Sequence, residues 1–289
     1  MSNQMLTLVA RLLPDAVFAR VHVLAKLGYW PDLKNPRTFS ERLQAKKLFD
    51  RDPLIPLSAD KYTVRDLVTS ELGSEFLPEL YYVAESAEQI DVTALPKAYA
   101  MKGSHGSGMN RFVANGELTN EEARVLAAQW LAQSFYWKRR EWAYRPLTPR
   151  VVFEENLAPG GQIDDIKFFT FGGVPRMVQV DRDRHSNHAR VLFDTQWRKL
   201  DVVYDHPQPD EPIPAPKQLD DMLDVAQRLG QHFGFARIDL YALPDRILVG
   251  EVTHYPDGGA VRFVPNGLDA ELGAVWGEGR AIDEAFLAR

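Results

Sequence analysis

The pattern of apolar and polar positions changes near the middle of the chain, from helical spacing to strand alternation. The segment up to about Pro56 predicts helices, and residues 60–72 predict another helix. Pro14 interrupts the first apolar stretch, Met5 to Trp30, and favours two short helices over one long helix. From residue 150 onward, β-branched and aromatic residues predict strands. Helices at the front and antiparallel strands behind predict an α+β fold.

Capping signals mark where several of the expected helices begin. Ser40 precedes a charged helical segment and is its expected N-cap. Thr119 and Glu122 have the spacing of a capping box, in which each side chain bonds to the backbone of the other residue. A further amphipathic helix is expected from Leu219, after the proline-rich residues 205–216.

Short runs of β-branched and aromatic residues, separated by turn-forming residues, predict the strands. The expected strands cover residues 99–102, 111–113, 151–157, 166–171, 176–180, 191–194, 236–242 and 246–253. The first two lie on either side of a glycine-rich segment, and we expect them to form a hairpin with a mobile loop.

The composition excludes several classes of function. Apolar residues make up 45% of the chain and charged residues 26%, as in an ordinary globular protein. The net charge of −6 argues against broad binding to nucleic acid, so we expect no nucleic-acid partner. The chain has no cysteine, which excludes disulfides, thiolate catalysis and cysteine-based zinc sites and fits a reducing cytoplasm.

The apolar N-terminal stretch is interrupted by charged side chains, among them Arg11, Asp15, Arg20 and Lys26. A membrane span needs about 20 mostly apolar residues, so we expect no transmembrane helix here, and no secretory signal is evident. Helices docked on the domain are expected, and helices that lie on a membrane surface are the alternative. The expected location is therefore the cytoplasm, with the inner face of the membrane left open.

The glycine-rich segment is the first candidate for chemistry. Lys102 precedes residues 103–108, which contain Gly103, Gly106 and Gly108. Glycine lets backbone N–H groups approach phosphate oxygens closely, and a preceding lysine adds positive charge. The segment is not a Walker A loop, because no Gly-Lys-Ser/Thr ends it. A plain hairpin turn is the alternative interpretation.

A second candidate lies in the last expected hairpin, where Arg237 and Asp239 precede a turn and Glu251 follows it. Strand side chains alternate between the two faces of a sheet. With an odd number of loop residues, Arg237 would lie opposite Glu251 and Asp239 would share their face. An even number would turn Glu251 to the other face. Two carboxylates and an arginine on one face form a place for Mg²⁺ and phosphate, with a solvated salt-bridged face as the alternative.

Three further segments carry polar groups beside apolar strands. Glu154 and Glu155 end one strand and are suited to bonding an amine or a ribose, or simply turn to water. Lys167 begins another strand, where it either faces phosphate or extends to the surface. The polar run of residues 179–190 suits a loop that grips an anionic substrate. Its histidines lack a third metal ligand at suitable spacing, so metal binding there is not favoured.

Taken in order, these segments resemble the ATP-grasp superfamily and, more closely, the TupA-like ATP-grasp family, which is linked to teichuronopeptide and surface-polysaccharide synthesis. The resemblance covers residues 36–273. It is carried by the segments PRTFSERLQ, ADKYTVRDLV, AMKGSHGSGMN, YWKRREWAY, PRVVFEENL, DDIKFFTFGGVPRMVQVDRDRHSNHAR, FARIDLYALPDRILVGEVTHYPDGG and LDAELG.

The resemblance implies two α+β lobes that clasp ATP, with a helical N-terminal extension. We expect residues 1–56 to form the extension, residues 57–152 the N-terminal lobe with the glycine-rich loop, and residues 153–289 the C-terminal lobe with the Mg²⁺ and ATP site. A full Rossmann-like domain, which often helps to hold the substrate in this superfamily, does not fit before Asp60.

The resemblance also implies a role for each candidate residue. Nucleotide binding is assigned to Lys61, Lys102, Gly103, Ser104, Gly106, Ser107, Gly108, Lys167 and the hinge residues Glu154, Glu155, Asn156 and Leu157. Mg²⁺ is assigned to Asp239 and Glu251, with Thr253 where many relatives have asparagine. Catalytic contacts to the transferred phosphate or the substrate are assigned to Arg237, Lys102, Arg182 and Arg184.

The implied activity is an ATP- and Mg²⁺-dependent carboxylate–amine ligase that forms an amide through an acylphosphate. The implied substrates are a uronic-acid sugar, or another small-molecule or glycan carboxylate, and an amino acid or another amine. A sugar kinase with Asp181 or Asp183 as base is one alternative. A glycosyltransferase that uses Asp181-Arg182-Asp183 is another. The oligomeric state is left open.

Overall fold

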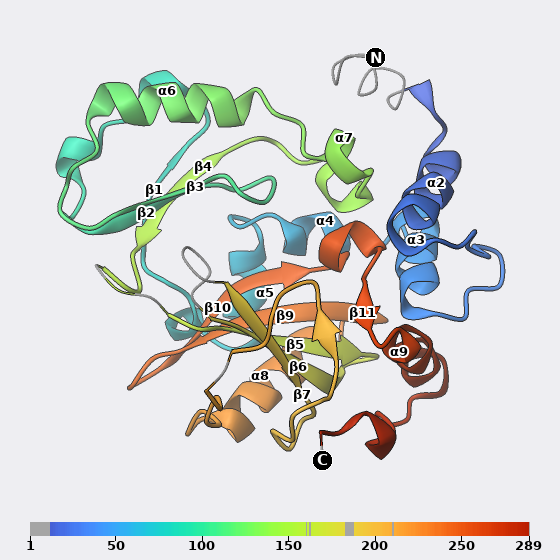
Figure 1. The fold of residues 1–289 in the computed structure, drawn as a ribbon. Coiled ribbons are helices and arrows are strands. Elements are labelled where there is room, and N and C mark those ends of the chain that lie inside the picture. The colour runs from blue at the N-terminus through green and yellow to red at the C-terminus, as the bar shows by residue number, and fades with distance from the viewer. Residues whose placement is uncertain (1–11, 160, 162, 183–187, 210, 289) are drawn as a thin grey trace.

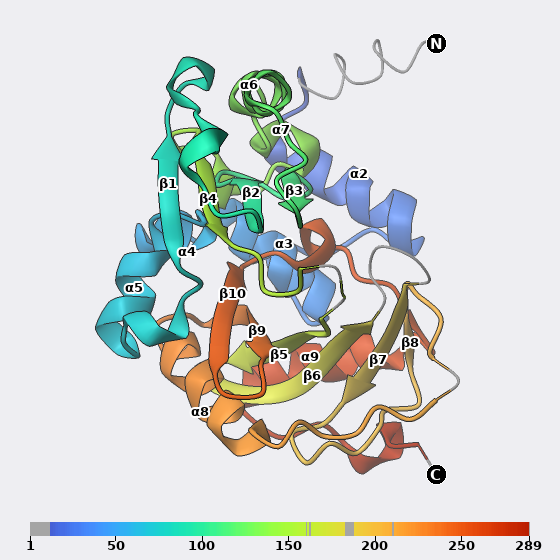
Figure 2. The same ribbon diagram turned by 90° about the vertical axis from the view of Figure 1, so that its left-hand side faces the viewer.

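The computed structural model describes residues 12–159, 161, 163–182, 188–209 and 211–288. Two antiparallel sheets form its framework, and Figures 1 and 2 show the smaller sheet standing over the larger one. The strand order is β1-β4-β2-β3 in the four-stranded sheet and β10-β9-β5-β6-β7 in the five-stranded sheet, while β8 and β11 form a small separate ladder. This is the α+β architecture that the sequence predicts.

The strands lie close to the expected ranges, with shifts of a few residues at their ends. In chain order they are β1 (Leu80–Ala84), β2 (Tyr99–Gly103), β3 (Asn110–Val113), β4 (Val151–Glu155), β5 (Asp165–Phe171), β6 (Val174–Arg182), β7 (Ala189–Phe193), β8 (Val203–Tyr204), β9 (Phe235–Ala242), β10 (Ile247–Thr253) and β11 (Phe263–Val264).

The helices surround the two sheets. They are α2 (Asp15–Leu27), α3 (Phe39–Phe49), α4 (Leu54–Ala59), α5 (Val64–Glu71), α6 (Asn120–Leu131), α7 (Tyr136–Arg139), α8 (Leu219–Gly230) and α9 (Gly267–Glu278). Short 3₁₀ turns are η1 (Ser74–Phe76), η2 (Ala87–Gln89), η3 (Val92–Ala94), η4 (Trp142–Tyr144), η5 (Pro256–Gly259) and η6 (Glu284–Phe286). The first part of the expected N-terminal helix pair, residues 1–11, lies outside the described residues.

The cap of α3 differs from the prediction. Thr38, not Ser40, is the N-cap, and Thr38 and Glu41 form a reciprocal capping box. Ser40 lies inside the helix, where its backbone N–H and hydroxyl both donate to Asp269 of α9. A tertiary partner therefore takes the side chain that the sequence suggested as a cap. The capping box of Thr119 on α6 is confirmed.

The β9–β10 hairpin differs from both versions of the prediction. Its turn comprises residues 243–246, an even number, which by itself would send Glu251 to the wrong face. A β-bulge between Val249 and Glu251 shifts the register by one residue. As a result Glu251 pairs with Asp239, and Arg237 pairs with Thr253 instead of with Glu251 as expected. The bulge at Gly250 thus returns all four side chains to one face.

The two faces of the five-stranded sheet are covered differently. The lower face is apolar, with residues such as Phe168, Ile238 and Leu240 packed on α8 in one buried cluster. Part of the upper face is also apolar, because Phe169 and Phe235 pack with Phe39 of α3 and with α9 in a second cluster. The rest of the upper face carries charged side chains and faces the smaller sheet. Figure 1 shows α8 below the large sheet, and α3 and α9 to its right.

A third apolar cluster joins α6 to the four-stranded sheet, with Tyr99, Phe153 and Trp130 among its members. Helices α4 and α5 pack elsewhere, since Ile55, Ala59, Val64 and Val68 belong to the cluster below the larger sheet. The proposed lobe boundaries at residues 56 and 152 stay predictions. Within the described residues, none of the helices combines the length and apolarity needed to cross a membrane.

Candidate active site between the two sheets

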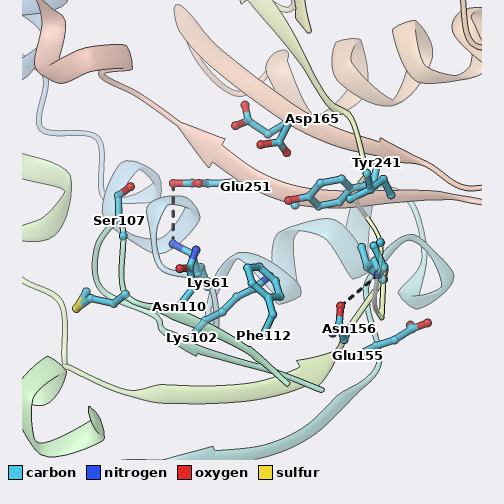
Figure 3. A pocket seen from close by; sticks show the side chains of 18 of the residues that line it. Lys61, Lys102, Ser107, Asn110, Phe112, Glu155, Asn156, Asp165, Tyr241 and Glu251 are labelled. Carbon is cyan, nitrogen blue, oxygen red and sulfur yellow. Dashed lines mark hydrogen bonds and ion pairs between the residues drawn. The ribbon is translucent and has the colours of Figure 1, made fainter. Parts of the chain in front are cut away.

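A cavity of about 470 Å³ opens between the glycine-rich hairpin of the small sheet and the charged part of the large sheet. Figure 3 shows side chains that converge on it from both sides, with Lys61 and Lys102 facing Glu251 and Tyr241. The predicted residues that line it are Lys61, Lys102, Gly106, Ser107, Gly108, Glu155, Asn156, Leu157, Asp239 and Glu251. Segments far apart in sequence thus meet at one site.

The glycine-rich loop is anchored along its first half and open at its tip. The fully buried hydroxyl of Ser104 donates to Asp60 at 2.7 Å, so Ser104 holds the loop and does not line the cavity. Lys61 donates from its ammonium group to the carbonyl of Gly106 at 2.8 Å. Gly108 has φ of +79°, a left-handed conformation that favours glycine. Gly103 ends strand β2 and also lies away from the cavity wall.

Lys102 is positioned by an acid on the neighbouring strand. Its ammonium group donates to Glu154 at 2.6 Å, and Arg65 approaches the other oxygen of the same carboxylate at 3.8 Å. Glu154 is buried and does not line the cavity, whereas Lys102 does. Glu154 therefore orients the lysine, and its carboxylate is not directed at a ribose as the resemblance implies.

The segment after β4 forms the far end of the cavity. Glu155 forms an ion pair with Arg246 at 2.5 Å, which joins the small sheet to the turn of the β9–β10 hairpin. Asn156 donates to the carbonyl of Val113 at 3.0 Å, and Leu157 lies beside it on the wall. These contacts fit a hinge between the two sheets with exposed backbone and apolar groups for a flat ring.

Asp239 and Glu251 lie on the opposite wall as a cross-strand pair. Glu251 forms an ion pair with Lys61 at 4.0 Å across the cavity, marked by a dashed line in Figure 3. Mg²⁺ is commonly held by one or two carboxylates, with phosphate and water as the remaining ligands. The donor set of this pair therefore fits Mg²⁺ bound together with a nucleotide. Among the described residues, no group of three or more His, Cys, Asp or Glu side chains forms a metal site.

Arg237 grips Asp239 in a bidentate ion pair, with both N–O distances at 2.7 Å. Burial opposes the charge of this guanidinium, but the Asp239 carboxylate raises the pKa of Arg237 well above its ordinary value. The hydroxyl of Thr253 accepts a hydrogen bond from Arg237 at 3.1 Å. Neither Arg237 nor Thr253 lines the cavity, so both support Asp239 from behind.

Lys167 lies deep in the large sheet and not on the cavity wall. Its ammonium group contacts Asp165 at 2.9 Å, Asp239 at 3.0 Å and Asp181 at 3.8 Å. A buried ammonium needs such partners, because its transfer from water is otherwise costly. Lys167 therefore holds the carboxylates of the charged face in place and reaches the cavity only through them.

The polar run after β6 is split by the structure. Burial opposes ionisation of Asp181, but Arg190 donates a hydrogen bond at 2.6 Å and, with Lys167, holds the pKa of that carboxyl well below its usual range. Arg182 is paired with Asp164 at 2.9 Å and does not line the cavity. Arg184 lies outside the described residues, as do residues 183, 185, 186 and 187. Its catalytic assignment stays a prediction.

Several cavity residues were not predicted from the sequence. These are Met109, Asn110, Phe112, Ala114, Ala158, Gly161, Ile163, Asp165, Tyr241 and Gly250. Strand alternation was a usable signal for two of them, since Asp165 precedes Lys167 by two positions and Tyr241 follows Asp239 by two. Phe112 lies under the ammonium group of Lys102, 5.9 Å from nitrogen to ring centre, and no local sequence pattern indicated that contact.

Solved structures with a related fold are ATP-grasp ligases and D-alanine–D-alanine ligases. The D-alanine–D-alanine ligase from Bacillus anthracis is 18% identical with a TM-score of 0.43, over 68% of this chain and 57% of the other. The ATP-grasp ligase PsnB, solved with a minimal precursor, Mg and ADP, is 14% identical with a TM-score of 0.40, over 74% and 57%. The ligase from Helicobacter pylori is 12% identical with a TM-score of 0.40, over 71% and 53%.

This chain therefore spans less than two thirds of the length of these solved proteins. No curated protein sequence matches the chain. A family model does match: the model described as TupA-like ATPgrasp aligns with residues 41–276, which contain both cavity walls. With the two-sheet fold and the glycine-rich hairpin over a carboxylate pair, this match shows that the chain belongs to the TupA-like ATP-grasp family.

Proposed function

We propose that this protein is an ATP-dependent carboxylate–amine ligase that forms an amide through an acylphosphate. The observation that carries the proposal is the cavity itself. One wall presents Lys102 and the open tip of the glycine-rich loop, and the other presents the carboxylates of Asp239 and Glu251. Positive charge and free backbone groups opposite a metal-binding pair suit a Mg²⁺–triphosphate.

The lining residues suggest how the nucleotide would lie. Asn156 and Leu157, with Phe112 opposite, would hold the adenine, and Glu155 would reach the ribose. Lys102 and Gly106–Gly108 would contact the phosphates, and Lys61 would bridge the loop to Glu251. Asp239 and Glu251 would hold Mg²⁺, which supplies neutralisation of the phosphate charge when it is bound.

The residues of the chain then act mainly by positioning and charge stabilisation. A substrate carboxylate attacks the terminal phosphorus of ATP, and ADP leaves with the electrons of the broken P–O bond. Arg237 holds Asp239 in place beside that phosphate. An amine then attacks the acyl carbon, and phosphate leaves as the amide forms. The glycine-rich loop over the site would exclude water, which otherwise hydrolyses the acylphosphate.

We further propose, from the family alone, that the carboxylate belongs to a uronic-acid-type sugar or another glycan and that the amine belongs to an amino acid. A role in polysaccharide synthesis in the cytoplasm, with α2 and the preceding segment at the inner face of the membrane, is part of this proposal. Its support on the N-terminal side is the outer surface of α2, where Val17, Val21 and Leu24 are exposed.

The alternative bases at Asp181 and Asp183 gain no support. Asp181 is buried and already paired with Arg190, and Asp183 lies outside the described residues. A sugar kinase and a glycosyltransferase are therefore outcomes to be tested. A thermal-shift comparison separates the nucleotide classes, and we expect Mg·ATP to raise the melting temperature more than Mg·UDP-sugars do.

The decisive experiment measures ADP release with a panel of acids and amines. We expect release to need both an acid and an amine, and Glu251→Gln to lower it by at least about a hundredfold. Asp245→Asn, at an exposed position in the turn of the same hairpin, serves as the matched control and should leave it unchanged. ADP release with a sugar alone, or full activity in Glu251→Gln, contradicts the proposal.

A further inference from the structure

The segment of residues 136–144, YWKRREWAY, has no part in the nucleotide cavity, although the family resemblance includes it. It forms α7 and η4 and packs against both moving parts of the site. Phe135, just before it, packs directly on Gly106 of the glycine-rich loop. The aliphatic stem of Arg139 lies directly on Gly258 in the η5 turn that follows β10. Figure 1 shows α7 between the tip of the β2–β3 hairpin and that turn.

Helix α3 ties the segment and the turn together. The ammonium group of Lys47 donates to the carbonyls of Arg139 at 3.1 Å and Gly258 at 2.8 Å. The side-chain amide of Gln44 donates to the carbonyls of Gly258 at 3.0 Å and Gly259 at 2.7 Å. Lys47 is fully buried, so its donors are used inside the protein. These bonds hold Arg139 over the turn in a defined place.

The η5 turn presents an acid in an unusual backbone conformation. Asp257 has φ of +51°, and Gly258 and Gly259 continue the left-handed path with φ of +71° and +78°. Among the described residues, Tyr204 is the hydrogen-bond partner of the Asp257 carboxylate, and no ion pair reaches it. Burial opposes ionisation, but the hydroxyl of Tyr204 and the charges of Arg190, Lys26 and Arg237 lower the pKa of Asp257. It is therefore an ionised carboxylate.

Two more charged groups beside the turn lack partners. Within the described part of the chain, neither the guanidinium of Arg139 nor the carboxylate of Glu141 forms an ion pair or a side-chain hydrogen bond, although Glu141 is buried at 6% exposure. The neighbouring cations differ, since Arg237 is paired with Asp239 and Arg190 with Asp181. A buried carboxylate without a partner points to a missing ligand, because desolvating it is costly.

The charges around Glu141 place it beside the metal-binding strand. Burial raises the pKa of Glu141 to about 7, and the carboxylates of Glu251 on β10 and Asp257 on η5 add to that rise. Lys47 on α3 and Arg139 on α7 act in the opposite direction. The cluster of Arg139, Glu141 and Asp257 therefore lies next to Glu251, at the phosphate end of the proposed nucleotide site.

We propose that this cluster binds an α-amino acid acceptor, with Arg139 contacting its carboxylate and Asp257 and Glu141 contacting its ammonium group. The inference rests on the proposed ligase function and names the class of its amine substrate. A guanidinium matches a carboxylate through two parallel hydrogen bonds, and carboxylates are the natural partners of an ammonium group. An α-amino acid is a small molecule that carries both groups side by side.

The arrangement also explains why the unpaired charges are tolerated. An ammonium group placed between Asp257 and Glu141 favours the ionised form of Glu141. A bound carboxylate supplies the partner that Arg139 lacks. The site would then hold the amine close to Glu251, where the acylphosphate is expected to form, and Gln44 and Lys47 would set the position of the whole turn through its carbonyls.

The test is calorimetric titration of the full chain with the twenty standard amino acids in the presence of saturating Mg·AMP-PNP. For the best amino acid, its carboxamide and its deaminated acid are titrated as well. We expect both analogues to bind at least about tenfold more weakly than the amino acid, the loss that follows from one charge-assisted hydrogen bond. Binding of Mg·AMP-PNP itself, measured first, reports separately on the proposed nucleotide site.

Two variants assign the two ends of the ligand. In Arg139→Gln the amino acid and its carboxamide should bind equally, and in Asp257→Asn the preference over the deaminated acid should disappear. Asparagine also tolerates the left-handed backbone at position 257. Lys138→Gln, on the same turn of α7, is the matched control and should retain both preferences. A fold defect alone would weaken every ligand and would not exchange one preference for another.

Two outcomes overturn the inference while leaving the nucleotide site intact. One is binding of Mg·AMP-PNP with no binding of any amino acid. The other is retention of both analogue preferences in Arg139→Gln and Asp257→Asn. Absence of Mg·AMP-PNP binding is a different result, because it contradicts the proposed ligase function itself.

Discussion

The upper face of the five-stranded sheet has two halves built from the same strands. At one end Phe169, Phe171 and Phe235 pack against Phe39 of α3, with ring centres 5.0 to 6.1 Å apart. At the other end Lys167 and Asp239 lie on the same strands and face the cavity wall. Strands β5 and β9 therefore change from aromatic to charged side chains without changing face.

The two halves contribute differently to stability and function. The aromatic half buries apolar area, which is the main favourable contribution to folding. In the charged half each acid is matched by a base, and such buried pairs add little net stability, because desolvation offsets their attraction. We infer that the charged half is retained for the site and that the aromatic half supports it. Three variants test this division.

The largest effect is expected in the aromatic half. Phe39→Ala removes a fully buried ring that contacts the aromatic side chains of β5 and β9, and we expect the free energy of unfolding to fall by about 3–5 kcal/mol. Urea denaturation measures it. The affinity of the remaining folded protein for Mg·ATP should stay the same. Trp30→Ala, at 59% exposure, is the control and should change the stability by less than about 0.5 kcal/mol.

A smaller, pH-dependent effect is expected beside the charged half. Burial raises the pKa of Glu141 from 4.5 to about 7 in the folded state, so the folded state binds that proton more tightly. Stability conferred by the proton is complete below pH 4.5 and is lost as the pH rises towards 7. Relative to the wild type, Glu141→Gln should therefore gain on the order of 2 kcal/mol between about pH 5 and pH 7.5.

Thermal unfolding of both proteins across that pH range measures the difference. Phe235→Leu is the matched variant in the aromatic half and should keep the pH profile of the wild type, since no titratable group is removed. An equal pH dependence in Glu141→Gln and the wild type would contradict the burial argument and would remove the contrast between the two halves.

The smallest effect is expected at Thr253. Its hydroxyl supports Arg237 and does not line the cavity, so Thr253→Ala should cost about 1 kcal/mol of stability. The Mg²⁺ concentration for half-maximal activity should change less than about threefold, in contrast to Glu251→Gln. A large shift in Mg²⁺ dependence would show that Thr253 ligates metal, as the family resemblance implies, and would move it to the functional half.

Much of the cavity followed from the sequence. Lys102 with its glycines, the carboxylates Asp239 and Glu251, and the segment after β4 were all singled out and all reach one cavity. Local chemistry sufficed there, because a glycine cluster and alternating charged positions in a strand are visible in short windows. Lys167 and Glu154 were assigned to the nucleotide but lie behind the wall, since strand alternation does not tell how deep a side chain is buried.

The face of Glu251 shows most clearly where local reasoning ended. The turn of residues 243–246 predicts the wrong face, and the bulge at Gly250 corrects it. A bulge depends on the partner strand, which no window of sequence contains. The same applies to Ser40, whose side chain bonds to Asp269 across the fold instead of capping its own helix.

By itself the sequence determined the α+β class, the order of the elements and the residue types of a phosphate and metal site, because periodicity and short motifs depend on neighbouring residues. Only the tertiary structure decided which half of the sheet is sealed by α3 and α9 and which stays open. It alone placed Lys167 beneath the carboxylates and brought Arg139 and Glu141 to the turn at Asp257. Those outcomes depend on contacts between distant segments, and burial and charge pairing act only once the segments meet.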